Sequence, residues 1–143
     1  MKKILVINGP NINLTGIREP DVYGSRPYDS LVGFIHDKAA SMGLEVCVYQ
    51  SNHEGCIIDR IQQALTESDA IIINPAAYTH TSIAILDALK AVGLPTVEVH
   101  LSDISQREEF RRFSYVSLYA EKTISGHGFD GYAMAMEYLA EKY

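Results

Sequence analysis

The chain has 143 residues, of which 47% are hydrophobic and 21% charged, enough to bury the core of one ordinary domain. Its formal net charge is -6 and it has no Lys/Arg-rich run, which argues against a nucleic-acid partner or an anionic membrane surface, because both require counter-charge. A small anionic substrate stays compatible with this charge, since a few local arginines can outweigh the global sign.

The first apolar run, residues 4–7, follows two lysines but ends at Asn8-Gly9-Pro10, too early for a secretory signal. No other stretch reaches the length of a transmembrane helix, so no membrane partner is expected. Cys47 and Cys56 lack a CxxC spacing and fall in a predicted strand and a predicted helix. We therefore expect both thiols to be reduced and buried, and the protein to be cytoplasmic.

Apolar segments of strand length alternate with helical patterns along the chain. Strands are predicted at residues 3–7, 45–49, 70–73 and 96–99, with a weaker fifth near 122–124. Between them run helical patterns, and each set of residues is predicted to share one helix face: Leu31, Phe34, Ile35, Lys38 and Ala39, then Ile57, Ile58, Ile61, Ala64 and Leu65, then Ile83, Leu86 and Leu89.

Capping residues mark the ends of these helices. Asp29 or Ser30 could cap the start of the first, and Gly43 would end it. Gly93 with Pro95 would end the third. Strands rich in Ile and Val, separated by single amphipathic helices, predict an α/β fold with a parallel sheet covered on both faces. We expect one flavodoxin-like, doubly wound, five-stranded domain over residues 1–143.

Polar residues follow each predicted strand, where ligands bind in sheets of this type. The segments are Gly9-Pro10-Asn11, Ser51-Asn52-His53, Asn74-Pro75, His100-Leu101-Ser102 and Gly126-His127. Any one of them could serve only as a turn or a cap. Together they favour a functional crevice.

The connection over residues 11–27 is long enough to be an active-site lid. It holds Arg18 and Tyr23, with Gly16 and Gly24 as possible hinges. A tyrosine has a pKa of about 10 and is a poor base at neutral pH unless a cation stabilises the phenolate. Arg18 could be that cation. Alternatively, both side chains are simply solvated.

Glu98 and His100 lie two residues apart on a predicted strand and so share one face, where the carboxylate could orient or charge the imidazole. At the strand end, His100 could donate a proton to a ligand. The alternative is a histidine that only hydrogen-bonds a loop.

A short helix opening at residues 100–103 would place Arg107 and Arg111 on one face. Free amides at its start could bind a carboxylate, so the pair suggests an acidic metabolite. Surface ion pairs with Glu108 and Glu109 are the alternative explanation for these arginines.

The segment from Gly126 to Gly131 matches G-x-G-x-x-G, but too little chain follows for a dinucleotide-binding unit, so we interpret it as a tight strand-to-helix turn. Walker A, HExxH and G-x-S-x-G sequences are absent. The histidines show no metal-ligand spacing. They are His36, His53, His80, His100 and His127. Neither a metal nor a cofactor is expected.

Several of these segments also occur, in this order and at matching intervals, in one enzyme family. They are residues 7–13, 18–20, 23–24, 50–55, 73–82, 97–102 and 107–111. From end to end the chain resembles type II 3-dehydroquinate dehydratase. The resemblance implies conversion of 3-dehydroquinate to 3-dehydroshikimate and water through an enolate, without metal or cofactor, in a homododecamer built from trimers.

The resemblance also implies roles for individual residues. Tyr23 corresponds to the base beside the ketone, Arg18 to the cation that lowers its pKa, and His100 to the acid. Asn11 corresponds to a residue that positions a water. The remaining residues correspond to the site for the substrate hydroxyls and ring (Asn74, His80, Asp87 and Arg111), to the carboxylate site (the amides of Leu101 and Ser102), and to supporting positions (Glu98 and Arg107). We place His80 and Asp87 on the third helix.

A few positions depart from the family pattern, namely Thr15, Ala76, Asp103-Ile104-Ser105 and Phe113. None is a position to which a catalytic role is carried over. Two other readings are a flavodoxin-like module for a phosphate ligand or flavin and a catalytically dead scaffold. The first would need a loop rich in hydroxyls after the first strand, whereas Pro10 lacks even an N–H. The second conflicts with the intact Arg18, Tyr23 and His100.

Overall fold

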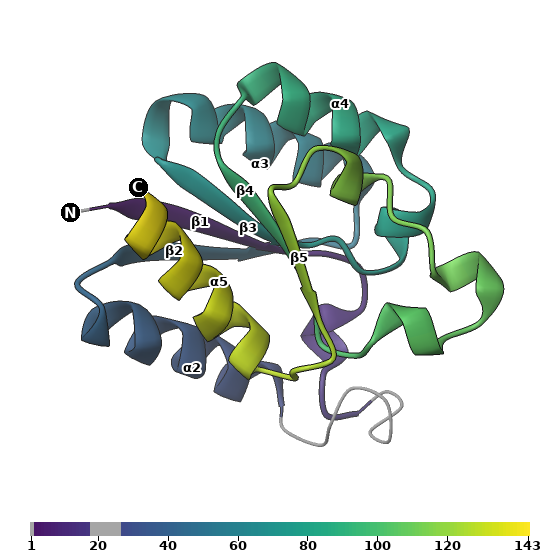
Figure 1. The fold of residues 1–143 in the computed structure, drawn as a ribbon, viewed down its shortest axis with the longest axis horizontal. Coiled ribbons are helices and arrows are strands. Elements are labelled where there is room, and N and C mark those ends of the chain that lie inside the picture. The colour runs from purple at the N-terminus through teal and green to yellow at the C-terminus, as the bar shows by residue number, and fades with distance from the viewer. Residues whose placement is uncertain (1, 18–26) are drawn as a thin grey trace.

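Five parallel strands form one sheet in the order β2-β1-β3-β4-β5 (Figure 1). The computed structural model describes residues 2–17 and 27–143. The strands are β1 (Lys3–Asn8), β2 (Glu45–Gln50), β3 (Ala70–Asn74), β4 (Thr96–His100) and β5 (Lys122–Ser125). All five predicted strands are present, and each ends one residue later than predicted. The added residues are polar, but their backbones still pair, as in the register of Asn8 with Asn74.

Helices cover both faces of the sheet (Figure 1). Helices α2 (Tyr28–Ser41) and α5 (Asp130–Lys142) pack on one face, and α3 (Glu54–Glu67) and α4 (Ile83–Val92) on the other. Alternate residues of β1 serve the two layers, because Ile4 and Val6 join the first core cluster and Leu5 and Ile7 the second. This arrangement confirms the predicted doubly wound, flavodoxin-like fold.

The helix ends were predicted in part. Helix α2 begins at Tyr28 after Pro27 and has no side-chain cap, so the predicted cap by Asp29 or Ser30 is wrong. Pro27 occupies the cap position with an extended backbone, so Asp29 and Ser30 lie inside the first turn instead of ahead of it. Gly43 follows the end of α2 with φ 69°, and Gly93 caps α4 with φ 71°, as predicted.

The predicted buried faces needed correction where a helix begins or ends. Ile83 in the first turn of α4 is 53% exposed, and Leu65 in the last turn of α3 is 60% exposed. In α2, Leu31, Ile35 and Ala39 are buried as expected, whereas Lys38, predicted on the same face, is exposed. Both cysteines, predicted to be buried, are free and exposed: Cys47 lies on β2, an edge strand, and Cys56 in the first turn of α3.

The predicted glycine-rich turn is confirmed. Gly126 and Gly128 have φ values of 83° and 55°, which glycine adopts without strain. Gly131 lies in α5 against the sheet, where an added Cβ would come within 3.2 Å of Val99 Cγ1. The third glycine thus allows close packing of α5 on β4.

Short 3-10 helices occupy the connections at the site end of the sheet. They are η1 (Ile12–Leu14), η2 (Ala76–His80), η3 (Ile104–Gln106), η4 (Glu109–Arg111) and η5 (Val116–Leu118). The single helix predicted to carry Arg107 and Arg111 is therefore wrong, because Arg107 is extended between η3 and η4. Of the predicted lid, residues 11–17 contain η1, and residues 18–26 lie outside the described part. No helix within the described residues could cross a bilayer.

Candidate active site

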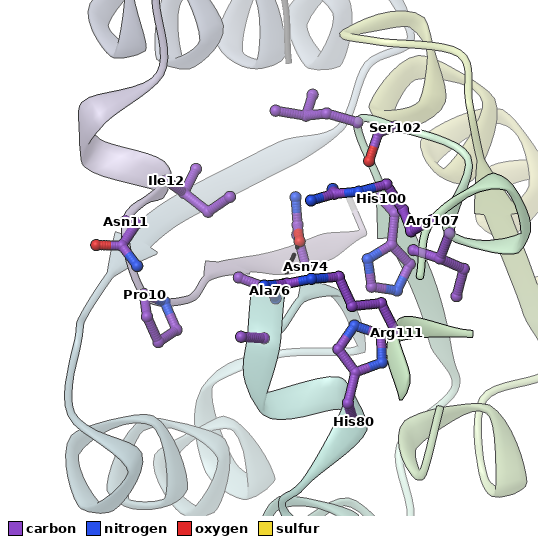
Figure 2. A pocket seen from close by; sticks show the side chains of 13 residues that line it. Pro10, Asn11, Ile12, Asn74, Ala76, His80, His100, Ser102, Arg107 and Arg111 are labelled. Carbon is purple, nitrogen blue, oxygen red and sulfur yellow. Dashed lines mark hydrogen bonds between the residues drawn. The ribbon is translucent and has the colours of Figure 1, made fainter. Parts of the chain in front are cut away.

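A pocket opens beyond the carboxyl ends of β1, β3 and β4 (Figure 2). Its lining comprises Pro10, Asn11, Ile12, Asn74, Ala76, Ala77, His80, His100, Leu101, Ser102, Ile104, Arg107 and Arg111. The polar segments after β2 and β5 do not line this pocket. Those two strands are the sheet edges, so only the three inner strand ends converge as predicted.

Glycine at position 9 brings the ends of β1 and β3 together. Its N–H donates to the Asn74 carbonyl at 2.8 Å, and an added Cβ would lie 2.6 Å from the Pro75 carbonyl oxygen. That contact is too short for any side chain, so Gly9 allows Asn74 to lie beside the first loop.

Asn11, in that first loop, has a left-handed backbone with φ 69°. Its N–H donates to Asn52 Oδ1 at 3.0 Å, and Gln50 Nε2 donates to the same oxygen at 3.1 Å. Gln50 and Asn52 therefore hold the turn that presents Asn11. In the sequence, Asn52 was one of several polar residues after a predicted strand, and its contact with Asn11 was not predicted.

His100 and Glu98 form a hydrogen-bonded pair at the pocket wall, as their i, i+2 spacing predicted. His100 Nε2 donates to Glu98 Oε2, and both side chains are buried. The bond engages one ring nitrogen and fixes the tautomer, which leaves Nδ1 for a ligand. A buried carboxylate placed this way can also stabilise positive charge that develops on the ring.

The buried Glu98 carboxylate stays ionised through several further hydrogen bonds. Thr79 Oγ1 and Ser114 Oγ each lie 2.7 Å from Oε2, and Thr123 Oγ1 donates to Oε1 at 3.3 Å. Burial by itself would raise the Glu98 pKa, but hydrogen bonds and charge from His100, with the hydroxyls, hold it below its ordinary value. Thr79, Ser114 and Thr123 were missed in the sequence, where nothing links these hydroxyls to Glu98.

His80 lies in η2 rather than on the third helix, so its predicted position is corrected, yet it lines the pocket. Its Nδ1 donates to the Phe113 carbonyl at 2.7 Å, which leaves Nε2 as an acceptor in the neutral ring. Burial lowers the pKa of His80, and the nearby His100 and Arg111 charges add to this effect against the Phe113 hydrogen bond. The ring therefore favours its neutral form.

Both arginines line the pocket although they do not share a helix (Figure 2). Arg111 also forms an ion pair with Glu108, with Nε 2.6 Å from Oε2, so the predicted surface ion pair is confirmed for it, and binding of an acidic ligand stays a prediction. The backbone at Leu101 is fixed by the Gly128 N–H, which donates to its carbonyl at 3.0 Å. The lining of one small pocket thus combines the side chains of Arg107 and Arg111 with Leu101 and Ser102, which suits an anionic ligand.

Two of the predicted site residues that the structure describes do not line this pocket: Glu98, which lies behind His100 and is hydrogen-bonded to it, and Asp87. Asp87 is exposed on α4 and is not part of the lining. Arg18 and Tyr23 lie outside the described residues. Within residues 2–17 and 27–143, no group of three or more His, Cys, Asp or Glu side chains is placed to hold a metal ion.

Comparison with known proteins agrees with this geometry. A family profile described as dehydroquinase class II matches residues 2–140. The 3-dehydroquinate dehydratase of Caldicellulosiruptor saccharolyticus is 56% identical over 99% of this chain and 98% of that protein.

Solved structures agree as well. The type II dehydroquinase of Butyrivibrio crossotus superposes with a TM-score of 0.95 at 50% identity, covering 96% of this chain and 97% of that one. The enzyme from Propionibacterium acnes gives the same TM-score at 42% identity, covering 99% and 98%. With the fold, the strand-end pocket and the sequence in agreement over its length, the chain belongs to the class II dehydroquinase family.

Proposed function

We propose that this chain is a type II hydro-lyase that converts 3-dehydroquinate to 3-dehydroshikimate and water in the pocket of Figure 2. The observation that carries the proposal is the His100–Glu98 pair at the wall of a pocket that also holds Arg107 and Arg111. A small anionic hydroxy-ketone needs both an acid for its leaving group and cations for its carboxylate.

Tyr23 is the proposed base and Arg18 the cation that lowers its pKa. A proton beside a ketone is weakly acidic, so its removal needs a base within hydrogen-bonding reach and donors for the enolate oxygen. A phenolate paired with a guanidinium meets the first need. Asn11, at the rim of the pocket, would position a water for the enolate.

His100 is the proposed acid that protonates the departing hydroxyl. Glu98 would hold the ring in one tautomer and stabilise the imidazolium before the proton leaves. Elimination then transfers the His100 proton to the hydroxyl, the enolate reforms the ketone, and the new double bond is conjugated with it. Water is the only other product.

The substrate carboxylate would bind the amides of Leu101 and Ser102, with Asn74, His80 and Arg111 at the hydroxyls and ring and Arg107 in support. Asp87, exposed on α4, could contact substrate only from a neighbouring copy of the chain. This is one reason to propose a homododecamer. Light scattering should give twelve times the 15.9 kDa mass of one chain, and a monomer would contradict the proposal.

The decisive assay is the rise in enone absorbance when purified protein meets 3-dehydroquinate without added metal or cofactor. We expect turnover that survives prior treatment with EDTA. The absence of turnover would rule out the proposed function. The same reaction serves aromatic biosynthesis and quinate breakdown, and growth on quinate of a strain lacking the gene would distinguish them.

Two variants separate the proposed base from the proposed acid. Tyr23→Phe should abolish both turnover and exchange of the substrate's acidic proton with solvent deuterium. His100→Ala should eliminate poorly but still exchange, because Tyr23 remains. Mass spectrometry of recovered substrate measures the exchange. Normal turnover by Tyr23→Phe would require another base.

We also propose a cytoplasmic location, which the two free thiols support, because oxidising compartments favour paired cysteines. Immunodetection in fractionated cells tests it.

A further inference from the structure

Four polar side chains form a hydrogen-bonded row beneath the pocket. Asn74 Nδ2 donates to Tyr132 Oη at 3.0 Å, and Tyr132 Oη donates to Asn8 Oδ1 at 2.6 Å. Asn8 Nδ2 then donates to Tyr28 Oη at 3.4 Å. The row joins the ends of β1 and β3 to the starts of α5 and α2. Of its members, Asn74 lines the pocket.

The direction of this row follows from one backbone group. The Ala76 N–H lies 3.2 Å from the Asn74 side chain and can only donate, so the carboxamide must present Oδ1 to it (Figure 2). Nδ2 of Asn74 then faces Tyr132, whose oxygen must accept. The Tyr132 proton is left for Asn8, whose oxygen must face it. If the Asn74 carboxamide were flipped, its NH2 group would face the Ala76 N–H, and two donors would point at each other.

Burial makes this order costly to break. Tyr132 and Asn8 are 0% exposed and Asn74 is 2% exposed, so water does not compete for their polar atoms. An unpaired polar group in such a place is strongly disfavoured. Burial also raises the pKa of Tyr132, which keeps its hydroxyl protonated. Tyr132 accepts one Nδ2 hydrogen of Asn74, and within the described part of the chain the other has no acceptor, so it remains for a ligand.

We propose that Tyr132 is a positioning residue for substrate binding: together with the Ala76 N–H, it holds the Asn74 carboxamide so that an N–H, rather than the carbonyl, faces the ligand. The inference rests on the proposed function, since it takes Asn74 as a substrate-binding residue. It adds that the ligand atom opposite Asn74 must accept a hydrogen bond. Tyr132 itself does not line the pocket.

The test compares steady-state kinetics on 3-dehydroquinate for the wild type, Tyr132→Phe, Asn74→Ala and the double variant. Phenylalanine keeps the ring but leaves Asn74 Nδ2 without its acceptor, so we expect KM to rise about tenfold with a smaller change in kcat. In the Asn74→Ala background, Tyr132→Phe should change KM less than about twofold, because its effect acts through Asn74.

Tyr138→Phe is the matched control. Tyr138 lies on the same helix, and its hydroxyl donates at 3.0 Å to Glu121 at an exposed site, so its loss should leave KM unchanged. A folded Tyr132→Phe variant with wild-type KM would overturn the inference. So would a tenfold effect that persists without the Asn74 side chain, since that would show a general structural role.

Neutron diffraction from deuterium-exchanged wild-type crystals keeps the inference testable if Tyr132→Phe does not fold or if the wild type does not turn over 3-dehydroquinate. The second result would refute the proposed function alone. Deuterium on Asn74 Nδ2 facing Tyr132, with the Tyr132 deuteron facing Asn8, is the expected result. An Asn74 carbonyl facing Tyr132 would overturn the inference.

Discussion

Glu98 is a fully buried carboxylate whose hydrogen bonds come from an imidazole and three hydroxyls. An unpaired charge in this place would be prohibitively costly, but hydrogen bonds to charged groups are among the stronger ones. The carboxylate therefore does two things at once: it orients His100 and ties η2 and the Ser114 segment to β4.

Replacement of this carboxylate by an amide should weaken both stability and turnover. In Glu98→Gln, the NH2 group of the glutamine replaces one carboxylate oxygen and points at side chains that are themselves donors. We therefore expect the free energy of unfolding at pH 7 to fall by about 2–3 kcal/mol. Urea denaturation measures it. Glu45→Gln, at an exposed position of β2, is the control and should change stability by less than about 0.5 kcal/mol.

The pH dependence of that loss has a definite sign. The folded-state pKa of Glu98 lies below its ordinary value of 4.5, so its ionised form stabilises the fold above pH 4.5. This contribution is lost as pH falls through the folded-state pKa. The difference between wild type and Glu98→Gln should thus shrink as the pH falls below 4.5. A difference that grew with acid would contradict this account.

Ala76 has a left-handed backbone, φ 52°, at the start of η2. This conformation costs an alanine roughly 1 kcal/mol and glycine almost nothing. Ala76 is one of the positions that depart from the family pattern, and its backbone conformation is one that glycine adopts without strain.

Ala76→Gly should therefore raise the free energy of unfolding by about 0.5–1 kcal/mol, because it removes the strain and loses only a half-buried methyl group. Differential scanning calorimetry would show a higher Tm. Ala40→Gly, in the regular part of α2, should do the opposite, since glycine destabilises a helix by a similar amount. A lower Tm for Ala76→Gly would mean that the methyl contact outweighs the strain.

Residue-level prediction from the sequence worked where spacing fixes geometry and failed where distant segments meet. Two residues along a strand place Glu98 and His100 on one face, so their pairing was predictable. Ser114 donates to Glu98 although it lies 16 positions further along the chain, in a segment of irregular structure. No local pattern in the sequence predicts such a contact. Asn8 and Tyr132, 124 positions apart, lie beyond local patterns for the same reason.

At the scale of elements, the start of α4 depends on one serine. Ser82 Oγ accepts from the Ile85 N–H at 3.0 Å and donates to Glu54 Oε2 at 2.5 Å, which joins α4 to the first turn of α3. A cap of this kind satisfies an N–H that the helix itself leaves unpaired.

Ser82→Ala should lower the free energy of unfolding by about 1–2 kcal/mol, because it removes the cap and leaves Glu54 with one donor fewer. Ser41→Ala, at the exposed end of α2, is the control and should have little effect. Chemical denaturation of both variants measures the difference. Equal losses would show that the cap contributes nothing beyond an ordinary surface serine.

Strands were easier to predict than the irregular segments around the site. Continuous Ile and Val identify buried parallel strands directly. His80 was placed on the third helix, yet the stretch from His80 to Ile83 holds the end of η2, a break at Thr81 and the cap of α4. The separation of Arg107 from Arg111 has the same cause, since short 3-10 turns leave no periodic signature.

At the scale of the whole molecule, the two cores share one sheet. Strand β1 contributes Ile4 and Val6 to the core on one face and Leu5 and Ile7 to the core on the other. If the sheet came apart on one side, the helices on the other side would therefore lose the surface on which they pack.

We therefore expect unfolding in a single cooperative transition. Urea curves followed by far-UV circular dichroism and by tyrosine fluorescence should coincide, the latter being usable because the chain has nine tyrosines and no tryptophan. A homo-oligomer would shift both midpoints together with protein concentration. Two separated transitions would show that the layers fold independently.

The left-handed backbone at Ala76 also has a genetic consequence. Every alanine codon becomes a glycine codon by one nucleotide change, GCN to GGN, whereas asparagine, another residue that tolerates this conformation, lies at least two changes away. A lineage selected for heat tolerance can thus relieve the strain in a single step, without altering any side chain that offers a hydrogen bond to substrate.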